Sequence, residues 1–561
     1  MLMAVVADEN GGGCLQPVGV DATPAGPAEP VANLVAAIAD RERRDRPRWV
    51  WAATSEIYPP LLRAGVRVKR CHDLELTEAL LLGYAGRWGQ PRSLSAAWAR
   101  LTDAPVPPDP PPRPPDSKVG QGTLFEPVSD PSAATGTDSL PVTIAVYADQ
   151  QSRLAQTAHP GRFRLLVAAE SASALIAEEM SDTGLPWRAD LHDALLVELL
   201  GEPSRLGGPP RKLVELTERI AAAFGVRQLH PESPAEVLRA FHRAGIDLPN
   251  TRAWVLRGVD HPAVPLLLEY KELYRIWTAH GWAWRDTWVR DGRFRPEYVP
   301  AGVVSGRWAT RGGGALQIPK VIRRAVVADP GWRFVIADAG QLEPRVLAAM
   351  SGDMRLAAAA GAGDLYVALA RDTFAGDRAQ AKLALLGAMY GQTGGAAIPA
   401  LAVLRRAYPT AFDFVETAAR AGEAGGLVRS WLGRTCPPAS KSPEVAGGEG
   451  PEVDADPFGP RVRAAARARG RFTRNFVIQA TAAEWAATLL ATLRGALAGT
   501  DAQLVFFQHD EVVVHCPETQ ADVVAGMIHE AGLRASRLLF GDTPVRFPLD
   551  VSLVDCYADA R

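Results

Sequence analysis

The segment FFQHDEVVVH, residues 506–515, is the feature that most constrains what this 561-residue chain can fold into. Its flanks, 504–507 and 512–514, are bulky or β-branched, which is typical of buried strands, and the polar break between them predicts a tight hairpin. That break holds His509, Asp510 and Glu511. Asp is a common turn residue, so an ordinary turn is one interpretation. Two adjacent carboxylates against an apolar sheet repel each other unless a cation joins them, which favours a divalent metal and a further carboxylate elsewhere.

A second aspartate occupies a similar position in WRFVIADAGQLEPRVLAAMSG, residues 332–352. Residues 334–337 have the pattern of a buried strand, Asp338 follows, and residues 340–350 predict a helix. Asp338 could be a plain helix N-cap. If the two strands are neighbours in one sheet, Asp338 and Asp510 lie side by side. That pair, with Glu511 beside it, suits two Mg²⁺ ions, which prefer oxygen ligands and promote phosphoryl transfer.

A predicted helix over residues 376–392 places two cations on one face. Arg378 and Lys382 are four residues apart, and Leu386 and Tyr390 continue the same stripe. From Arg378 to Tyr390 the helix spans roughly 18 Å, which suits a nucleotide with its phosphates at one end and its base at the other. A solvated basic face is the usual alternative. The chain has only seven lysines and this helix is otherwise apolar, so the nucleotide interpretation is favoured.

Composition limits the class of protein. The net charge of −2 does not by itself indicate a nucleic-acid binder, so any basic surface must be local. Five scattered cysteines without a CxxC pair argue against a disulfide framework or zinc site and fit a reducing cytosol. No apolar run is expected to approach the ~18 residues of a membrane span. We therefore expect a cytoplasmic protein with no membrane contact.

The chain divides at two flexible stretches. Residues 1–103 with 142–164 predict a small α/β domain, and Pro-rich residues 104–141 predict a disordered linker. Residues 165–300 are mostly amphipathic helix, and residues 301–561 mix strands and helices around a second flexible stretch at 436–460.

From about residue 165 onward, five motifs together resemble family A DNA polymerases, in that family's order. SGRWAT and LQIP (305–319) resemble its primer–template motif, DAGQLEPR (338–345) motif A, RAQAKLALLGAMYG (378–391) motif B, RFTRNFVIQATAAEW (471–485) the minor-groove motif and QHDE (508–511) motif C. The resemblance implies a mixed α/β right-hand fold. Thumb and the approach to the palm would lie in 165–300, palm and fingers in 301–561, and the fingers at about 353–435.

The resemblance also implies a function: template-directed addition of dNTPs to a primer 3′ end in replication or repair, with two Mg²⁺ ions. Asp338 and Asp510 would be the metal ligands, with Glu511 close by and Lys382 catalytic. The nucleotide-binding residues would be Gln341, Glu343 as the sugar gate, Tyr366, Arg378, Lys382, Leu386 and Tyr390. The DNA-binding residues would be Arg307, Gln317, Arg345, Arg471, Asn475, Gln479 and His509. We expect a monomer acting on primer–template DNA near the nucleoid.

Four departures from the family pattern predict altered speed and fidelity, with the chemistry retained. Ala339-Gly340 stand where Tyr-Ser is usual, Leu386 where an aromatic is usual, and Tyr366 where His is usual. The segment after Tyr390 is shorter, so the fingers are trimmed. Upstream of the minor-groove motif, residues 461–474 carry six arginines and no acid, which predicts either an exposed charged helix or a phosphate-tracking surface weakened by salt.

The N-terminal domain resembles a degenerate, RNase H-like 3′–5′ exonuclease. Its first strand offers only Asp8 and Glu9, which face opposite ways, and its third motif offers only Asp149 near Tyr147. We expect a structural remnant without exonuclease activity. In the linker, Gln121, Leu124 and Phe125 resemble the peptide by which bacterial polymerases dock on the sliding clamp; a chance match or a segment packed back on the protein is the alternative.

Three other functions remain open. One is a bifunctional polymerase with an active proofreading exonuclease. Another is a single-subunit RNA polymerase, against which Glu343 as a sugar gate argues. The third is a non-catalytic DNA-binding scaffold, against which the joint presence of Asp338, Asp510, Arg378 and Lys382 argues.

Overall fold

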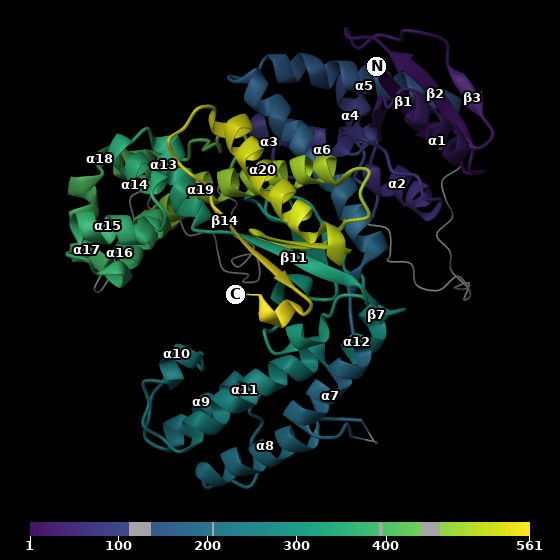
Figure 1. Cartoon of the computed structure of the whole chain (residues 1–561). Coiled ribbons are helices and arrows are strands. Elements are labelled where there is room, and N and C mark those ends of the chain that lie inside the picture. Colours follow the sequence, from purple (N-terminus) through teal and green to yellow (C-terminus); the bar gives the residue numbers. More distant parts are fainter. Residues whose placement is uncertain (112–135, 205–206, 392–396, 439–459, 561) are drawn as a thin grey trace.

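The computed structural model describes residues 1–111, 136–204, 207–391, 397–438 and 460–560. Figure 1 shows an N-terminal sheet with its helices at the upper right, a second sheet at the centre, a group of short helices at the left and a helical lobe below. The C-terminus lies near the central sheet, between the short helices and the lower lobe.

The N-terminal region is built on a five-stranded sheet of order β3-β2-β1-β4-β5. β1 pairs antiparallel with β2 and parallel with β4, and β4 pairs parallel with β5. The strands are β1 (Leu2–Ala7), β2 (Gly13–Val18), β3 (Glu29–Val31), β4 (Arg48–Trp51) and β5 (Arg70–Asp73). The helices are α1 (Leu34–Arg44), α2 (Thr54–Arg63), α3 (Leu74–Tyr84), α4 (Leu94–Leu101) and α5 (Gly136–Ala155).

The boundaries predicted for the two flexible stretches were partly wrong. Helix α5 begins at Gly136, and Leu140 is buried in the apolar cluster that includes Ala4 and Val50, so residues 136–141 belong to the N-terminal domain. Before the linker, the Asp109 side chain accepts hydrogen bonds from two backbone amides at Arg92–Ser93. Cys436 is also buried, and its backbone amide donates to Val428. Both segments are therefore ordered where an apolar side chain packs into a core, although the residues around it are typical of turns.

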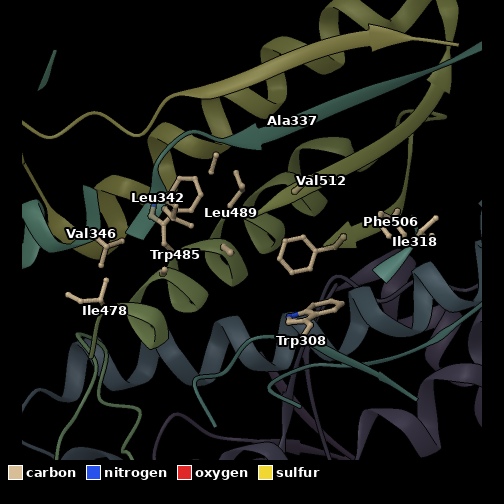
Figure 2. Close-up of a cluster of buried hydrophobic side chains, with 14 of the residues drawn as sticks. Trp308, Ile318, Ala337, Leu342, Val346, Ile478, Trp485, Leu489, Phe506 and Val512 are labelled. Carbon is tan, nitrogen blue, oxygen red and sulfur yellow. The ribbon is translucent and has the colours of Figure 1, made fainter. Parts of the chain in front are cut away.

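The central sheet is antiparallel, in the order β12-β13-β11-β14. Its strands are β11 (Trp332–Ala339), β12 (Gln503–Gln508), β13 (Glu511–Pro517) and β14 (Leu549–Val554). Helices α19 (Pro460–Leu497) and α20 (Ala521–Phe540) pack together beside it. Figure 2 shows the core under the strand ends, where Trp485 and Leu489 of α19 lie among Leu342, Ala337 and Val512. This packing fixes the two strands that carry the candidate carboxylates.

A group of short helices lies at the left of Figure 1, and all but the first of them fall in the range expected for the fingers, about 353–435. They are α13 (Leu342–Ser351), α14 (Met354–Gly361), α15 (Leu365–Thr373), α16 (Arg378–Tyr390), α17 (Ala397–Ala407) and α18 (Pro409–Glu423). Three of them start at an aspartate whose side chain accepts a backbone N–H of the first turn: Asp353, Asp364 and Asp377. The predicted helix over 376–392, with Asp377 as its cap, is confirmed.

The lower lobe corresponds to the expected thumb. It holds α7 (Ala189–Leu200), α8 (Arg211–Ala223), α9 (Pro234–Arg243), α10 (Ala253–Leu256), α11 (Ala263–His280) and α12 (Trp282–Trp288). The preceding helix α6 (Pro160–Thr183) packs against α2, β5 and α19, so it joins the N-terminal domain to the palm. Short strands lead to the palm: β6 (Leu185–Pro186), β7 (Val289–Arg290), β8 (Arg293–Phe294), β9 (Glu297–Val299) and β10 (Ala309–Arg311).

One described helix has the length and apolar character to cross a membrane, over Arg463–Leu497 of α19. This differs from the expectation that no segment would come near that limit. In its most apolar window 78% of the residues are buried inside the protein, as in a core helix. The helix packs against α18, α20 and α6.

Candidate active site

The structure places the two predicted aspartates at one end of the central sheet. β11 and β13 pair with Asp338 opposite Glu511, and the Ala339 amide donates to the Asp510 carbonyl over 3.2 Å. Asp510 lies in the two-residue turn of the β12–β13 hairpin. His509, the first turn residue, has a φ of 60°, a left-handed conformation that side chains rarely adopt and that is enriched at functional sites. The side-by-side arrangement expected from the sequence is confirmed.

Burial and mutual repulsion make these carboxylates unusual acids. Burial, followed by the negative charge of Asp338, raises the pKa of Asp510 to about 6. Burial also raises the pKa of Asp338. The negative charge of Asp550, the residue opposite Asp338 on the neighbouring strand β14, raises that pKa further. A nearby positive charge would favour the ionised form of both groups. Asp550 was not foreseen from the sequence, because its position opposite Asp338 depends on the register of β14.

The donor chemistry fits Mg²⁺. Within the described residues, no three His, Cys, Asp or Glu side chains gather into a complete metal-ligand set. Proteins typically hold Mg²⁺ through one or two carboxylates plus substrate phosphates and water. Asp338 and Asp510 are the residues that would hold it.

Glu511 is engaged by the protein itself. The Tyr557 hydroxyl donates to its carboxylate, and Arg323 Nη1 lies 3.7 Å from the same oxygen. The Arg323 guanidinium also stacks 4.2 Å from the Tyr557 ring centre. Neither partner was foreseen from the sequence, because Tyr557 comes from the C-terminal segment and Arg323 from a short 3-10 helix before β11. Glu511 is thus held beside Asp338 and Asp510, and its burial raises its pKa.

A cavity of about 290 Å³ opens beside the aspartates. Of the predicted residues, its walls include Arg307, Asp338, Gln341, Glu343, Leu386, Tyr390, His509 and Asp510. Glu343 is held from two sides: Arg307 forms an ion pair with one carboxylate oxygen, and the Tyr390 hydroxyl donates to the other at 2.6 Å. The side chain of Glu343, the proposed sugar gate, is therefore held in a fixed orientation between Tyr390 of α16 and Arg307.

The two cations of α16 lie outside the walls of that cavity. Both are exposed, and Tyr366 of α15 lies beneath them, with its ring centre 5.5 Å from the Arg378 guanidinium and 6.0 Å from Lys382 Nζ. Arg378 is paired with Asp364, at 2.7 and 3.1 Å. This partner was missed because Asp364 looks like an ordinary helix cap, which it also is. A bound triphosphate would have to compete with Asp364 for Arg378.

The DNA-binding role expected for Arg345 is corrected. Its side chain is 1% exposed and donates to four backbone carbonyls, those of Gly340, Ala360, Gly363 and Arg546. A guanidinium committed to four carbonyls in the interior cannot reach a nucleic acid. It ties α13 to the loops around α14 and β14, and it positions the helix that carries Glu343.

Arg345→Ala should lower the free energy of unfolding by ~3 kcal/mol or more, because it leaves buried carbonyls without donors. Arg333→Ala is the matched control. Arg333 forms a partly exposed ion pair with Asp555, so its loss should cost ~1 kcal/mol at most. Urea unfolding of the three proteins measures the difference. Unchanged stability together with weakened DNA binding would restore the original assignment of Arg345.

A larger groove of about 910 Å³ adjoins the first cavity and shares Arg307, Trp308 and His509 with it. Gln317, Asn475 and Gln479 line it as well, so five of the seven predicted DNA-contact residues meet here. Among the described residues, Asn475 Oδ1 is buried without a hydrogen-bond partner. Arg471 is exposed and packs beside Gly391 at the end of α16 instead of lining the groove.

Two of the carboxylates singled out in the N-terminal domain form contacts within their own segments. Asp8 and Glu9 lie beyond the end of β1, and Asp8 accepts the amides of Asn10 and Gly12 within the turn. Asp149 is paired with Arg153 on α5. The placement expected on the first strand was therefore wrong by one or two residues. The proposed clamp motif, Gln121, Leu124 and Phe125, lies outside the described residues.

The chain is similar to known DNA polymerases. The family model described as DNA polymerase family A matches residues 210–553. "DNA polymerase I, thermostable" of Thermus filiformis is 29% identical over 373 residues, covering 63% of this chain and 42% of the relative. The enzyme of the same description from Thermus thermophilus is 28% identical over 330 residues, covering 54% and 37%. The chain thus matches about two-fifths of the length of these relatives.

A solved structure shares the fold over the whole chain. It is described as the POL domain of Pol1 from M. smegmatis in complex with DNA primer-template and dNTP, and it covers 100% of this chain and 95% of its own with a TM-score of 0.70. The sequence identity is 17%, so this likeness concerns the fold. With the family model matching more than half of the chain in the region that holds the carboxylates and the cationic helix, the chain belongs to DNA polymerase family A.

Proposed function

We propose that the protein is a template-directed DNA polymerase that adds dNTPs to a primer 3′ end. The observation that carries the proposal is the pair Asp338 and Asp510, brought together by β11 and the β12–β13 hairpin beside a cavity that a sugar-gate candidate lines. The groove that continues from this cavity supports primer–template DNA as the second substrate.

Each group has a task in this proposal. Asp338 and Asp510 would hold Mg²⁺, and the bound ion would supply activation of the primer hydroxyl and neutralisation of charge on the triphosphate. Lys382 and Arg378 bind the phosphates and stabilise the charge that develops on them. Glu343, fixed by Arg307 and Tyr390, closes the space around the sugar. His509, Asn475 and Gln479 face the duplex from the groove.

Further properties belong to this proposal. The protein acts as a monomer in the cytoplasm, in replication or repair. Its N-terminal domain is an exonuclease-like remnant without 3′–5′ exonuclease activity, an assignment supported by the contacts of Asp8 with turn amides and of Asp149 with Arg153. Its linker docks on the sliding clamp through residues 121–125. The groups retained at the central site favour a catalyst over a DNA-binding scaffold.

The test is extension of a 5′-labelled primer on a template by the purified chain. We expect full-length product with dNTPs and Mg²⁺, and none when the divalent cation is chelated. Binding to primer–template without any extension under these conditions would favour the non-catalytic scaffold.

Glu343→Ala should admit ribonucleotides, because it removes the carboxylate from the space that a 2′-hydroxyl would need. We expect discrimination between dNTP and rNTP to fall at least about tenfold, while Glu343→Gln, which keeps the side-chain volume, retains most of it. Competition between dCTP and CTP in single-nucleotide extension measures the ratio. Equal discrimination by wild type and Glu343→Ala would refute the gate.

A further inference from the structure

Phe472 is an exposed aromatic residue on the wall of the larger groove. Its side chain is 43% exposed, whereas Phe476, one turn later on α19, is 2% exposed. Phe472, Asn475, Phe476 and Gln479 all line the groove, and their spacing of three, four and seven residues places them on one face of the helix. Phe476 therefore lies in the buried part of this groove wall, and Phe472 lies at its solvent-exposed rim.

The rim is also cationic. The Arg469 guanidinium lies 5.5 Å from the centre of the Phe472 ring. Arg463, Arg467 and Arg471 are exposed on the same helix. An aromatic face beside an arginine, on a helix that carries further exposed arginines, is a combination that binds single-stranded nucleic acid, with bases stacked on the ring and phosphates held by the cations. The neighbouring Asn475 Oδ1, buried without a partner among the described residues, adds an open hydrogen-bonding position.

The position of Phe472 relative to the nucleotide site indicates which DNA strand it would contact, the template or the primer. α16 presents Arg378 and Lys382 at its start and Tyr390 at its end, so the base of a bound nucleotide lies toward Tyr390. Gly391 follows Tyr390, and a Cβ there would lie 2.9 Å from Arg471 Cγ. Phe472 thus directly follows Arg471, which packs at the end of α16 where the nucleotide base would lie. The strand that must reach this end is the template, because its base pairs with the incoming one.

We propose that Phe472 is a stacking contact for a template-strand nucleobase at the junction where the template passes from single strand to duplex. The proposal rests on the polymerase function proposed above and deepens it, because it assigns the residue that holds the template against the groove. A contact of this kind does not depend on base identity, since every base has a π-face.

The experiment places 2-aminopurine in the template at the first uncopied position of a primer–template. A second DNA carries the probe eight positions into the duplex. Stacking quenches this fluorophore, so wild type should keep the junction signal low, and Phe472→Ala should raise it at least about twofold. Phe472→Ala should also bind the primer–template roughly five- to a hundredfold more weakly, the loss of one base–aromatic stack.

Three variants separate stacking from packing. Phe472→Trp keeps an aromatic face and should restore the low junction signal, whereas Phe472→Leu keeps apolar volume and should behave like Phe472→Ala. Trp88→Ala removes a comparably exposed aromatic, at 46%, from the N-terminal domain and should leave both signals unchanged.

The outcomes distinguish the two proposals. If wild type binds and extends the primer but Phe472→Ala gives the same junction fluorescence and affinity, the stacking assignment is wrong. Rescue by Phe472→Leu as complete as by Phe472→Trp would reduce Phe472 to an apolar contact and also overturn it. If wild type neither extends the primer nor quenches the junction signal, the proposed polymerase function itself is wrong.

Discussion

Asp338→Ala and Asp510→Ala should each lower the rate of primer extension by at least ~10³-fold, which corresponds to ~4 kcal/mol or more of transition-state stabilisation. The reason is that each removes half of the paired carboxylates that would hold Mg²⁺. Neither residue belongs to the wall of the larger groove, so the affinity for primer–template should stay within a few-fold of wild type. Single-turnover extension and fluorescence anisotropy of labelled DNA measure the two quantities separately.

Asp550→Ala is the matched control for this prediction. Asp550 lies on β14, directly opposite Asp338 on β11, and it contributes to the raised pKa of Asp338. The Asp550 side chain is exposed. Its loss should change the extension rate by less than about tenfold. Extension by Asp338→Ala or Asp510→Ala at near wild-type rate would exclude the metal-binding assignment.

Lys382→Ala should lower kcat/KM for the incoming nucleotide by ~10²-fold or more. Among the described residues, Lys382 forms no ion pair. Its ammonium is therefore available to a triphosphate without breaking an ion pair. Arg378 differs, because its pairing with Asp364 must be exchanged for the phosphate. Steady-state single-nucleotide incorporation across a range of dNTP concentrations gives kcat and KM for each variant.

Asp364→Asn provides the internal comparison. It releases Arg378 from its carboxylate partner while keeping a side chain that can cap α15. We expect KM for the nucleotide to fall or stay equal in this variant, in contrast to its rise in Lys382→Ala. A loss of less than tenfold in Lys382→Ala would identify Lys382 as ordinary surface charge.

The sequence predicted the elements of the site because their local signals are strong. The β-branched flanks of 506–515 indicated a buried hairpin, and Asp377 with the periodic residues after it indicated α16. Both are confirmed. The pairing of β11 with β13 was expected only if the strands were neighbours, and their antiparallel register then determined that Asp338 lies opposite Glu511.

What the sequence did not predict depends on contacts between distant segments. Arg345 matched a motif position, but its burial follows from the loops that fold around it. The partners of Glu511 and Arg378 come from other segments, so no local pattern could identify them. The left-handed conformation of His509 also escaped prediction, because a turn without glycine gives no sequence signal for a positive φ.

The most direct test of the account is single-nucleotide incorporation by wild type on four primer–templates that differ only in the templating base. Each dNTP is supplied alone with Mg²⁺. The account predicts that the primer is extended efficiently only by the complementary dNTP on each template, and that the Asp510→Ala protein prepared in parallel extends none of them. Incorporation independent of the templating base, or equal incorporation by wild type and Asp510→Ala, would contradict it.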